Sequence, residues 1–285
     1  MNDCLPGFNR RVALRKVLSG AASVACCGVP VAGWSQPVSA ERWRLLVNEG
    51  ITAELSISML AMRYRGWADY LGAQLRSKQV TVDAVVDIPN FVRQAQADPK
   101  PLVVFGKSVN QLAKLVRDGG YQPLVRRADP YSAAFIVSKN SPLQTMEQLS
   151  GKKILMPDEA SATTALARAE ITRLGLRETY LSYTRFQDAV TTQVGSGVAE
   201  VGVVNPVMAK KWLETGGRVI GQTLSVVNWS VLACPAASAE QVGRLTDALL
   251  AMNLQSPQLL AEIGVKQWAR AERKDYLALL DYIKA

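Results

Sequence analysis

The sequence contains no histidine among its 285 residues. This absence removes the commonest general base, the histidine-based catalytic triads and most zinc sites. Carboxylates and lysines remain for acid–base chemistry, but no paired acidic motif or lysine pocket accompanies them. The sequence therefore disfavours an enzyme, and it predicts neither a metal site nor a cofactor.

Cysteine and long apolar runs are also scarce. Three of the four cysteines (Cys4, Cys26 and Cys27) lie in the first 40 residues, which leaves only Cys234. One thiol cannot form an internal disulfide, and Cys234 lies in an apolar strand pattern that predicts an inert core thiol. Beyond the N-terminal region, no stretch approaches the roughly 18–20 apolar residues that a membrane-spanning helix needs.

The first 40 residues have the composition of an export signal. Four basic side chains precede an apolar stretch at residues 17–32, and small residues lead to Ala40, after which we expect cleavage. The pair Arg10-Arg11 resembles a twin-arginine signal, but its neighbours depart from the preferred residues. The twin-arginine (Tat) and general secretory (Sec) routes therefore both stay open. A weak lipobox before Cys26 makes lipid anchoring a less favoured alternative.

The chain is basic, with a formal net charge of +9. Residues 1–40 hold four basic side chains and one acidic one, so the rest of the chain keeps 29 basic and 23 acidic groups and a net charge of +6. A positive surface raises the local concentration of anionic ligands, although solubility alone explains it equally well. Because the charges are scattered, nucleic acid is disfavoured as a partner.

Strand-like and helix-like segments alternate along the chain, which predicts an α/β protein. Strands are predicted at residues 42–48, 80–87, 101–105, 121–128, 132–138, 152–156, 179–186, 200–205, 218–221 and 228–233. Helices are predicted at residues 52–75, 89–97, 162–174, 187–194, 206–215, 239–253, 257–263 and 273–283, with two more that end at residues 117 and 150.

These segments are expected to form two lobes, each a mixed sheet flanked by helices. The chain is predicted to cross between them near Asp129-Pro130 and again near Thr223–Ser225. Lobe 1 then comprises residues 41–128 and 225–285, and lobe 2 comprises residues 129–224. Two crossings make a hinge, and a ligand is expected in the cleft between the lobes.

The segment at residues 129–164 carries the strongest functional signal. A strand, a Ser141-Pro142 turn, a short helix and a second strand lead into a hydroxyl-rich turn that opens a helix at Ala162. Free backbone N–H groups at a helix start, together with Ser and Thr hydroxyls, form an anion-binding site. The alternative is that Ser161 only caps the helix.

This segment resembles the phosphate/phosphite/phosphonate-binding proteins of ABC importers, whose pattern runs S-P, helix, L-x-G-K-x-[IV], strand, D-x-x-S-T-S-G, helix. Ala162 and Thr164 depart from the Thr and Gly of that pattern. Residues 63–71, 200–205 and 233–250 resemble further motifs of the same family, so the resemblance covers residues 42–255.

The resemblance implies a type II periplasmic binding protein fold, a two-lobed α/β receptor with two hinge crossings. Such a protein captures a small anionic ligand, a phosphonate- or phosphate-like oxyanion, and delivers it as a monomer to an ABC permease in the inner membrane. The alternative is a periplasmic sensor that presents its closed form to a membrane histidine kinase. Neighbouring genes for a permease and ATPase, or for a kinase, would separate the two.

Candidate ligand contacts lie where strands end and helices begin. They are Ser161, Thr163 and Thr164 in the hydroxyl-rich turn, Lys107 and Ser108 after the third strand, Asn48, Glu49 and Thr52 after the first, Tyr131 beside the first crossing, and Asn205 at the end of the strand at 200–205.

Several of these residues have two interpretations. Lys107 supplies a point charge to an anion, or it is solvated while Ser108 caps a helix. Glu49 suits an ammonium group better than a phosphonate dianion, which hints at an amino-bearing ligand, or it is solvated.

Arginine and tryptophan residues outside this set have mostly structural interpretations. Arg126-Arg127 reads as a solvated pair or an interlobe ion pair. Trp229 reads as a core residue rather than a hinge or pocket residue. Four other tryptophans have the spacing of core residues: Trp43, Trp67, Trp212 and Trp268.

Overall fold

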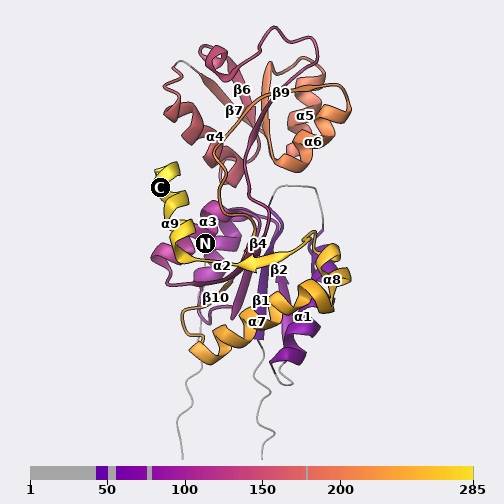
Figure 1. The fold of residues 1–285 in the computed structure, drawn as a ribbon, viewed down its shortest axis with the longest axis vertical. Helices are drawn as coiled ribbons and strands as arrows, with labels where there is room; N and C mark the ends of the chain where they lie inside the picture. Colours follow the sequence, from indigo (N-terminus) through magenta and orange to yellow (C-terminus); the bar gives the residue numbers. More distant parts are fainter. Residues whose placement is uncertain (1–42, 51–55, 76–78, 178, 285) are drawn as a thin grey trace, which may run out of the picture. The chain divides into compact units, whose positions relative to one another are not determined.

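The computed structural model of the chain describes residues 43–50, 56–75, 79–177 and 179–284. The predicted export signal and Thr52 lie outside these residues. Within them the strands form two mixed sheets, each with its own helices (Figure 1). The α/β class predicted from the sequence is confirmed.

The first sheet has the order β11-β4-β10-β3-β1-β2. Its strands are β1 (Trp43–Asn48), β2 (Val80–Ala84), β3 (Val103–Gly106), β4 (Gln122–Arg127), β10 (Ser230–Ala233) and β11 (Trp268–Arg270). Strand β1 is parallel to β2 and β3, whereas β10 runs antiparallel between β3 and β4.

The second sheet has the order β7-β6-β8-β5-β9. Its strands are β5 (Ala134–Val137), β6 (Lys153–Met156), β7 (Tyr180–Tyr183), β8 (Val201–Val204) and β9 (Arg218–Gln222). Strand β6 is parallel to β7 and β8, and β5 runs antiparallel between β8 and β9.

Parallel neighbours require long crossovers, which the helices supply. The helices near the first sheet are α1 (Ile57–Gln74), α2 (Ile88–Gln96), α3 (Val109–Asp118), α7 (Ala239–Gln255), α8 (Pro257–Glu262) and α9 (Arg273–Ile283). Those near the second are the 3₁₀ helix η1 (Met146–Leu149), α4 (Ala162–Arg173), α5 (Gln187–Gly195) and α6 (Pro206–Glu214). None of the helices in the described ranges has the length and apolar character of a membrane span.

An aromatic cluster forms the centre of the first sheet's core. The ring centroid of Trp67 lies 5.5 Å from that of Phe105 and 6.3 Å from that of Trp268, and all three side chains are buried. Trp43 is buried as well, and Trp212 packs partly buried on the second sheet's core while donating to the Val137 carbonyl (3.0 Å). The core interpretation of these four tryptophans is confirmed.

Strand β11 was not predicted from the sequence. Three residues, Trp-Ala-Arg, are too few to show an alternating pattern, and the strand is defined by its pairing with β4. The predicted strand at 179–186 is also shorter than expected, spanning Tyr180–Tyr183.

Two passages join the sheets, residues 128–133 between β4 and β5 and residues 223–229 between β9 and β10, and they are hydrogen-bonded to each other. Tyr131 and Val226 form an antiparallel bridge, with N–H···O distances of 3.0 and 2.8 Å. Asn228 adds a side-chain bond to the carbonyl of Asp129 (3.0 Å). The passages therefore form a short two-stranded connection, while the predicted lobe boundaries stay a prediction.

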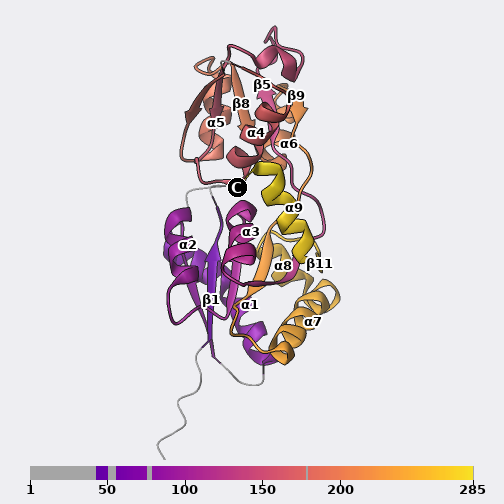
Figure 2. The same ribbon diagram turned by 90° about the vertical axis from the view of Figure 1, so that its left-hand side faces the viewer.

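The last helix, α9, also links helices of the first sheet to helices of the second. Helix α9 packs against α3 and α4 (Figure 2). The Tyr282 hydroxyl donates to the Glu170 carboxylate on α4 (2.5 Å), which Arg173 also contacts at 2.5 Å. Glu170 is buried.

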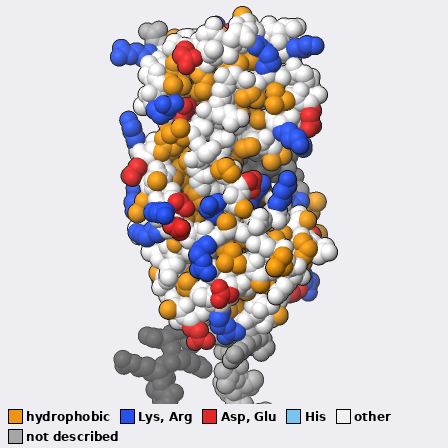
Figure 3. Space-filling model, in the orientation of Figure 1, with side chains coloured by type: hydrophobic (Ala, Val, Ile, Leu, Met, Phe, Trp, Pro, Cys, Tyr) orange, Lys and Arg blue, Asp and Glu red, His pale blue; other side chains and the backbone are white. Residues whose placement is uncertain are grey.

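Charged side chains are spread over the surface. On the face drawn in Figure 3, Lys and Arg side chains lie between acidic, apolar and uncharged polar ones and do not gather in one patch. This distribution matches the scattered charges of the sequence.

Gly202 of β8 lies under α5, and its missing side chain allows the helix to approach. A Cβ atom there would lie 2.6 Å from Val190 Cγ1 and 2.8 Å from Val194 Cγ2. We expect Gly202→Ala to lower the free energy of unfolding by about 1–3 kcal/mol through overpacking. Gly243→Ala, in α7 with no atom within 4 Å of the added Cβ, should be neutral or stabilising by up to about 1 kcal/mol in the same urea titration. Equal effects of the two changes would refute the packing argument.

The α9–α4 contact gives a second prediction. Removing the hydroxyl in Tyr282→Phe should cost about 1–2 kcal/mol of unfolding free energy, because a hydrogen bond to a buried carboxylate is lost. Tyr180→Phe is the control, since Tyr180 is 67% exposed and its hydroxyl has no partner among the described residues. Urea unfolding measures both, and a loss no larger than that of the control would contradict the linkage.

Candidate ligand-binding site

Four helices begin around one small cavity. Ser108 is the N-cap of α3, Ser161 of α4 and Asn205 of α6, while Gln187 is the first residue of α5, and all four line the cavity. Each helix start carries partial positive charge and backbone N–H groups without helical partners. The cavity therefore collects four positive helix ends, an arrangement that favours an anion.

The cavity brings together most of the predicted contacts. Its lining residues are Glu49, Gly50, Lys107, Ser108, Tyr131, Ser161, Ala162, Thr163, Gln187, Asn205 and Trp229. Seven of the nine predicted residues that the structure describes are among them. The cavity volume is about 20 Å³, room for about one water molecule.

A second cavity of about 180 Å³ adjoins the first and shares Tyr131, Asn205 and Trp229 with it. The remaining residues around it are Arg127, Asp129, Pro130, Pro206, Val207, Lys210 and Asn228. Proline, valine and indole surfaces make part of its wall apolar. The two cavities together offer a polar end and a less polar end.

A hydroxyl and amide network forms one wall of the first cavity. The Thr163 and Tyr131 hydroxyls lie 2.6 Å apart, and Gln187 Nε2 donates to Thr163 Oγ1 at 3.0 Å. Gln187 Oε1 in turn accepts from the Asn205 backbone N–H at 2.7 Å. Burial raises the pKa of Tyr131 to about 12, so its hydroxyl stays neutral. These groups are uncharged donors and acceptors held in fixed positions.

The opposite wall carries an ion pair. Lys107 Nζ donates to Glu49 Oε2 at 2.5 Å, and both side chains are about nine-tenths buried, with exposed fractions of 8% and 10%. Glu49 Oε1 accepts from the Tyr64 hydroxyl (2.6 Å) and from Arg63 Nη1 (3.1 Å). The Glu49 carboxylate is therefore not solvated, and it is already paired within the protein.

Burial and pairing act in opposite directions on these two groups. Burial would raise the pKa of Glu49, but the charge and hydrogen bond of Lys107, with Tyr64 and Arg63, outweigh it and lower that pKa. Burial lowers the pKa of Lys107, and Glu49 only partly offsets this. The carboxylate is thus the firmly charged partner.

Trp229 and Arg127 require corrections to the sequence interpretation. Lys107 Nζ lies 4.0 Å from the centroid of the Trp229 ring, and the Arg127 guanidinium carbon lies 4.4 Å from it. Trp229 packs on the core but also lines both cavities. Arg127 is buried and paired with Asp129 (2.5 Å), so it is not a solvated arginine.

Asn48 and Thr164 do not line the cavity, although both are buried beside it. Asn48 Nδ2 donates to the Val85 carbonyl (2.8 Å) and its Oδ1 accepts from Gly50 N–H (2.9 Å), which shapes the turn after β1. Thr164 Oγ1 donates to the Pro157 carbonyl (3.0 Å), and its N–H donates to Ser161 Oγ (3.2 Å). Ser161 does cap α4, as one sequence interpretation held. A direct ligand role for Asn48, Thr164 and the undescribed Thr52 stays a prediction.

Gln187 lines the cavity but was not among the contacts predicted from the sequence. It lies at a strand-to-helix turn, as Ser108, Ser161 and Asn205 do, so the same positional rule would have found it. The predicted helix at 187–194 also begins at Gln187, so the predicted boundary did not hide this residue.

Near the cavity, a separate contact joins α3, which lies near the first sheet, to the segment just before α4, which lies near the second. Asn110 Nδ2 and Gln111 Nε2 of α3 both donate to the Ala160 carbonyl, each at 3.0 Å. Ala160 precedes the α4 N-cap, so these two hydrogen bonds hold the start of α3 beside the start of α4.

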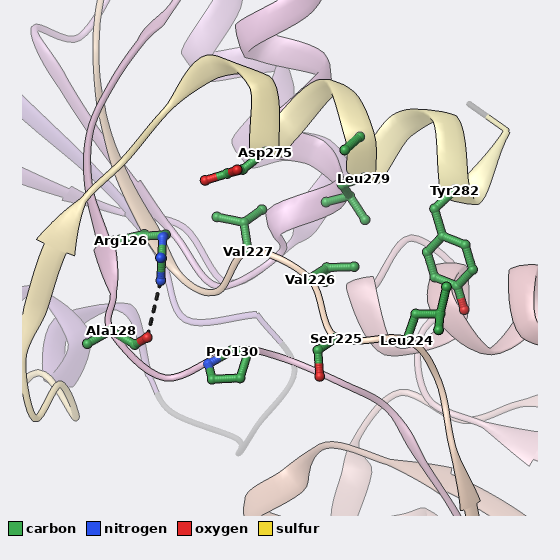
Figure 4. Close-up of a pocket in the computed structure, with 11 residues that line it drawn as sticks. Arg126, Ala128, Pro130, Leu224, Ser225, Val226, Val227, Asp275, Leu279 and Tyr282 are labelled. Atoms are coloured by element: carbon green, nitrogen blue, oxygen red, sulfur yellow. Dashed lines mark hydrogen bonds between the residues drawn. The ribbon is translucent and has the colours of Figure 1, made fainter.

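A larger cavity of about 500 Å³ lies elsewhere, between the passages and α9 (Figure 4). None of the predicted contacts lines it. Its walls are mostly apolar, and its one arginine, Arg126, is turned to the backbone, where Nη1 donates to the Arg127 and Ala128 carbonyls. Size alone does not make it the ligand site.

Comparison with known proteins decides the family. The family model described as "ABC transporter, phosphonate, periplasmic substrate-binding protein" matches residues 50–276. The chain belongs to this family. No curated protein shows significant sequence similarity to it.

Solved structures agree on the fold at low sequence identity. PhnD1 from Prochlorococcus marinus, in complex with methylphosphonate, has a TM-score of 0.70 at 15% identity, covering 86% of this chain and 98% of that one. A Xanthomonas citri protein bound to ATP has a TM-score of 0.71 at 16% identity, with 84% and 97% covered. A binding protein component of an ABC phosphonate transporter from Pseudomonas aeruginosa has a TM-score of 0.63 at 14% identity, with 83% and 85% covered.

Family membership confirms the resemblance stated from the sequence and the type II periplasmic binding protein fold. The family consists of periplasmic substrate-binding proteins, so the chain is a solute-binding protein rather than an enzyme. Membership implies a small-molecule ligand and a membrane permease as partner.

The buried ion pair gives a pH-dependent prediction. Glu49→Gln leaves the Lys107 ammonium without its carboxylate and should lower the unfolding free energy near neutral pH by about 3–5 kcal/mol. Because the folded pKa of Glu49 lies below its ordinary value of 4.5, this stabilisation is complete above that value and is lost as the pH falls through the folded pKa. The stabilities of wild type and Glu49→Gln should therefore approach each other as the pH falls below 4.5 and through the folded pKa of Glu49.

Urea unfolding at several pH values measures this difference. Glu214→Gln is the control, since Glu214 is exposed on α6 and has no ion-pair partner among the described residues. It should differ from wild type by less than about 0.5 kcal/mol throughout. A gap between wild type and Glu49→Gln that does not narrow at any acidic pH at which both stay folded would contradict the assignment.

Proposed function

We propose that this protein captures a small phosphonate-like oxyanion in the cavity at the four helix starts and delivers it to an ABC importer. The observation that carries this proposal is the convergence of α3, α4, α5 and α6: the N-cap residues of α3, α4 and α6 and the first residue of α5 all line one cavity. Helix N-termini and neutral hydroxyls bind oxyanions without a full countercharge.

The charge of the wall supports the same ligand class. Glu49 and Lys107 are the charged residues among the described ones that line the cavity, and they neutralise each other. Binding then depends on N–H groups and on the hydroxyls of Ser108, Ser161, Thr163 and Tyr131, which suit the several oxygen acceptors of a phosphonate.

The adjoining cavity has room for the organic substituent of such a ligand. Its volume of about 180 Å³ and its Pro130, Pro206 and Val207 surfaces suit a short alkyl group on the phosphorus atom. The oxygens would lie at the helix starts and the substituent beside Trp229. A phosphonate exceeds the first cavity as it stands, so entry requires the passages to bend and separate the walls.

A thermal-shift screen followed by calorimetry tests the proposal. The purified protein is exposed to phosphate, phosphite, sulfate, methylphosphonate, ethylphosphonate and simple carboxylates. A ligand at about 100 times its Kd stabilises the native state by about 2.7 kcal/mol, which is visible as a rise in Tm. We expect the alkylphosphonates to give the largest rises in Tm. If no phosphorus oxyanion raises the Tm, the proposed ligand class is refuted.

Site variants locate the binding. Thr163→Val keeps the shape of the side chain but removes a hydroxyl of the cavity wall, and it should weaken phosphonate binding by about 10- to 100-fold. Ser161→Ala should weaken it as well, with an added loss of about 1 kcal/mol in stability because the α4 cap is lost. Thr172→Val, on an exposed position of the same helix, is the matched control. Equal affinities of Thr163→Val and Thr172→Val would place the ligand elsewhere.

A further inference from the structure

Glu49 and Trp229 together have the composition of an ammonium-binding site. The Glu49 carboxylate and the Trp229 indole both line the first cavity, and both contact Lys107. A carboxylate beside an aromatic face is an arrangement that holds a primary ammonium group, through the ion pair and through attraction to the ring. Such a site would select ligands that carry an amino group next to their acid group.

The chain's own lysine fills this site. Lys107 Nζ lies 2.5 Å from Glu49 Oε2 and 4.0 Å from the centroid of the Trp229 ring. The lysine comes from the turn between β3 and α3, 58 residues from Glu49, so the tertiary fold creates the contact. Only 8% of the Lys107 side chain is exposed, so its ammonium group is largely removed from bulk solvent.

The same contact leaves hydrogen-bonding capacity toward a ligand. An ammonium group has three N–H donors, and Glu49 is the only hydrogen-bond acceptor that Lys107 contacts within the described residues. Lys107 lines the cavity, so its remaining donors are available to an oxyanion there. The carboxylate, by contrast, already accepts from Lys107, Arg63 and Tyr64.

We propose that Lys107 is the specificity-determining residue of the cavity: its ammonium group occupies the Glu49–Trp229 site, so the protein accepts oxyanions without an amino group and rejects their aminoalkyl counterparts. This inference rests on the proposed function, since it concerns the ligand of the same cavity. An amino-bearing ligand would have to displace Lys107 or place a second ammonium group beside it. Either alternative costs a buried hydrogen-bonded ion pair or a like-charge contact.

Matched ligand pairs test the proposal. Calorimetry compares ethylphosphonate with 2-aminoethylphosphonate, and ethanesulfonate with 2-aminoethanesulfonate, so that only the amino group differs within a pair. In the wild-type protein, the amino member of each bound pair should have a Kd at least about tenfold higher. An amino member that binds as well as its partner would overturn the proposal without any variant.

Lys107→Ala should reverse the preference. It vacates the space at Glu49 and Trp229, and the amino member should then bind at least as tightly as its partner. The double variant Glu49→Gln/Lys107→Ala has the same space without the carboxylate, so it should not gain affinity for the amino group. Circular dichroism checks that each variant is folded. A folded Lys107→Ala that still disfavours the amino group would overturn the proposal.

The two ligand pairs separate this inference from the proposed function. If the protein binds the sulfonates and not the phosphonates, the phosphonate assignment fails while the amino comparison still judges Lys107. Should Lys107→Ala not fold, the wild-type preference alone decides. If none of the four ligands binds to the wild-type protein or to the variant, both proposals are overturned.

Discussion

The pairing of the two inter-sheet passages is the constraint on which the site depends. The bridge between Tyr131 and Val226, and the bond from Asn228 to the Asp129 carbonyl, hold the chain together where it leaves one sheet and enters the other. Tyr131 and Trp229, which belong to these passages, reach into both cavities. Any rotation about the passages therefore moves the aromatic part of the wall, and the geometry of the connection and of the site cannot change independently.

The cavity combines two kinds of polar wall. The Thr163 hydroxyl and the Gln187 amide come from helices near the second sheet, whereas the Glu49–Lys107 pair comes from turns of the first sheet. Neutral donors favour an anion without fixing its charge, and an internally balanced ion pair adds polarity without net charge. If the proposed ligand binds here, selectivity for its acid group and selectivity against an amino group would be located on different walls of the cavity.

The sequence predicted the helix starts well, because capping residues and strand ends leave local signals. Ser161 caps α4 as one interpretation held, Asn205 lies at the strand-to-helix turn where it was predicted, and all the predicted sheet strands are present. Contacts between distant residues left no such signal. Strand β11 exists because Trp268–Arg270 pairs with β4, and the partner of Glu49 is a lysine from another turn. A carboxylate in a turn looks the same in the sequence whether water, a ligand or Lys107 neutralises it.

The shared acceptor at Ala160 has a kinetic consequence. Asn110 and Gln111 donate to one carbonyl oxygen, so a displacement of that oxygen lengthens both bonds together and the contact breaks as a unit. A contact of this kind gives a protein two discrete arrangements rather than a continuous range. For a solute-binding protein with its ligand at these helix starts, separation of α3 from α4 would have to break both bonds before a captured molecule leaves. Residence time would be adjustable at α3, on a residue pair outside the cavity lining.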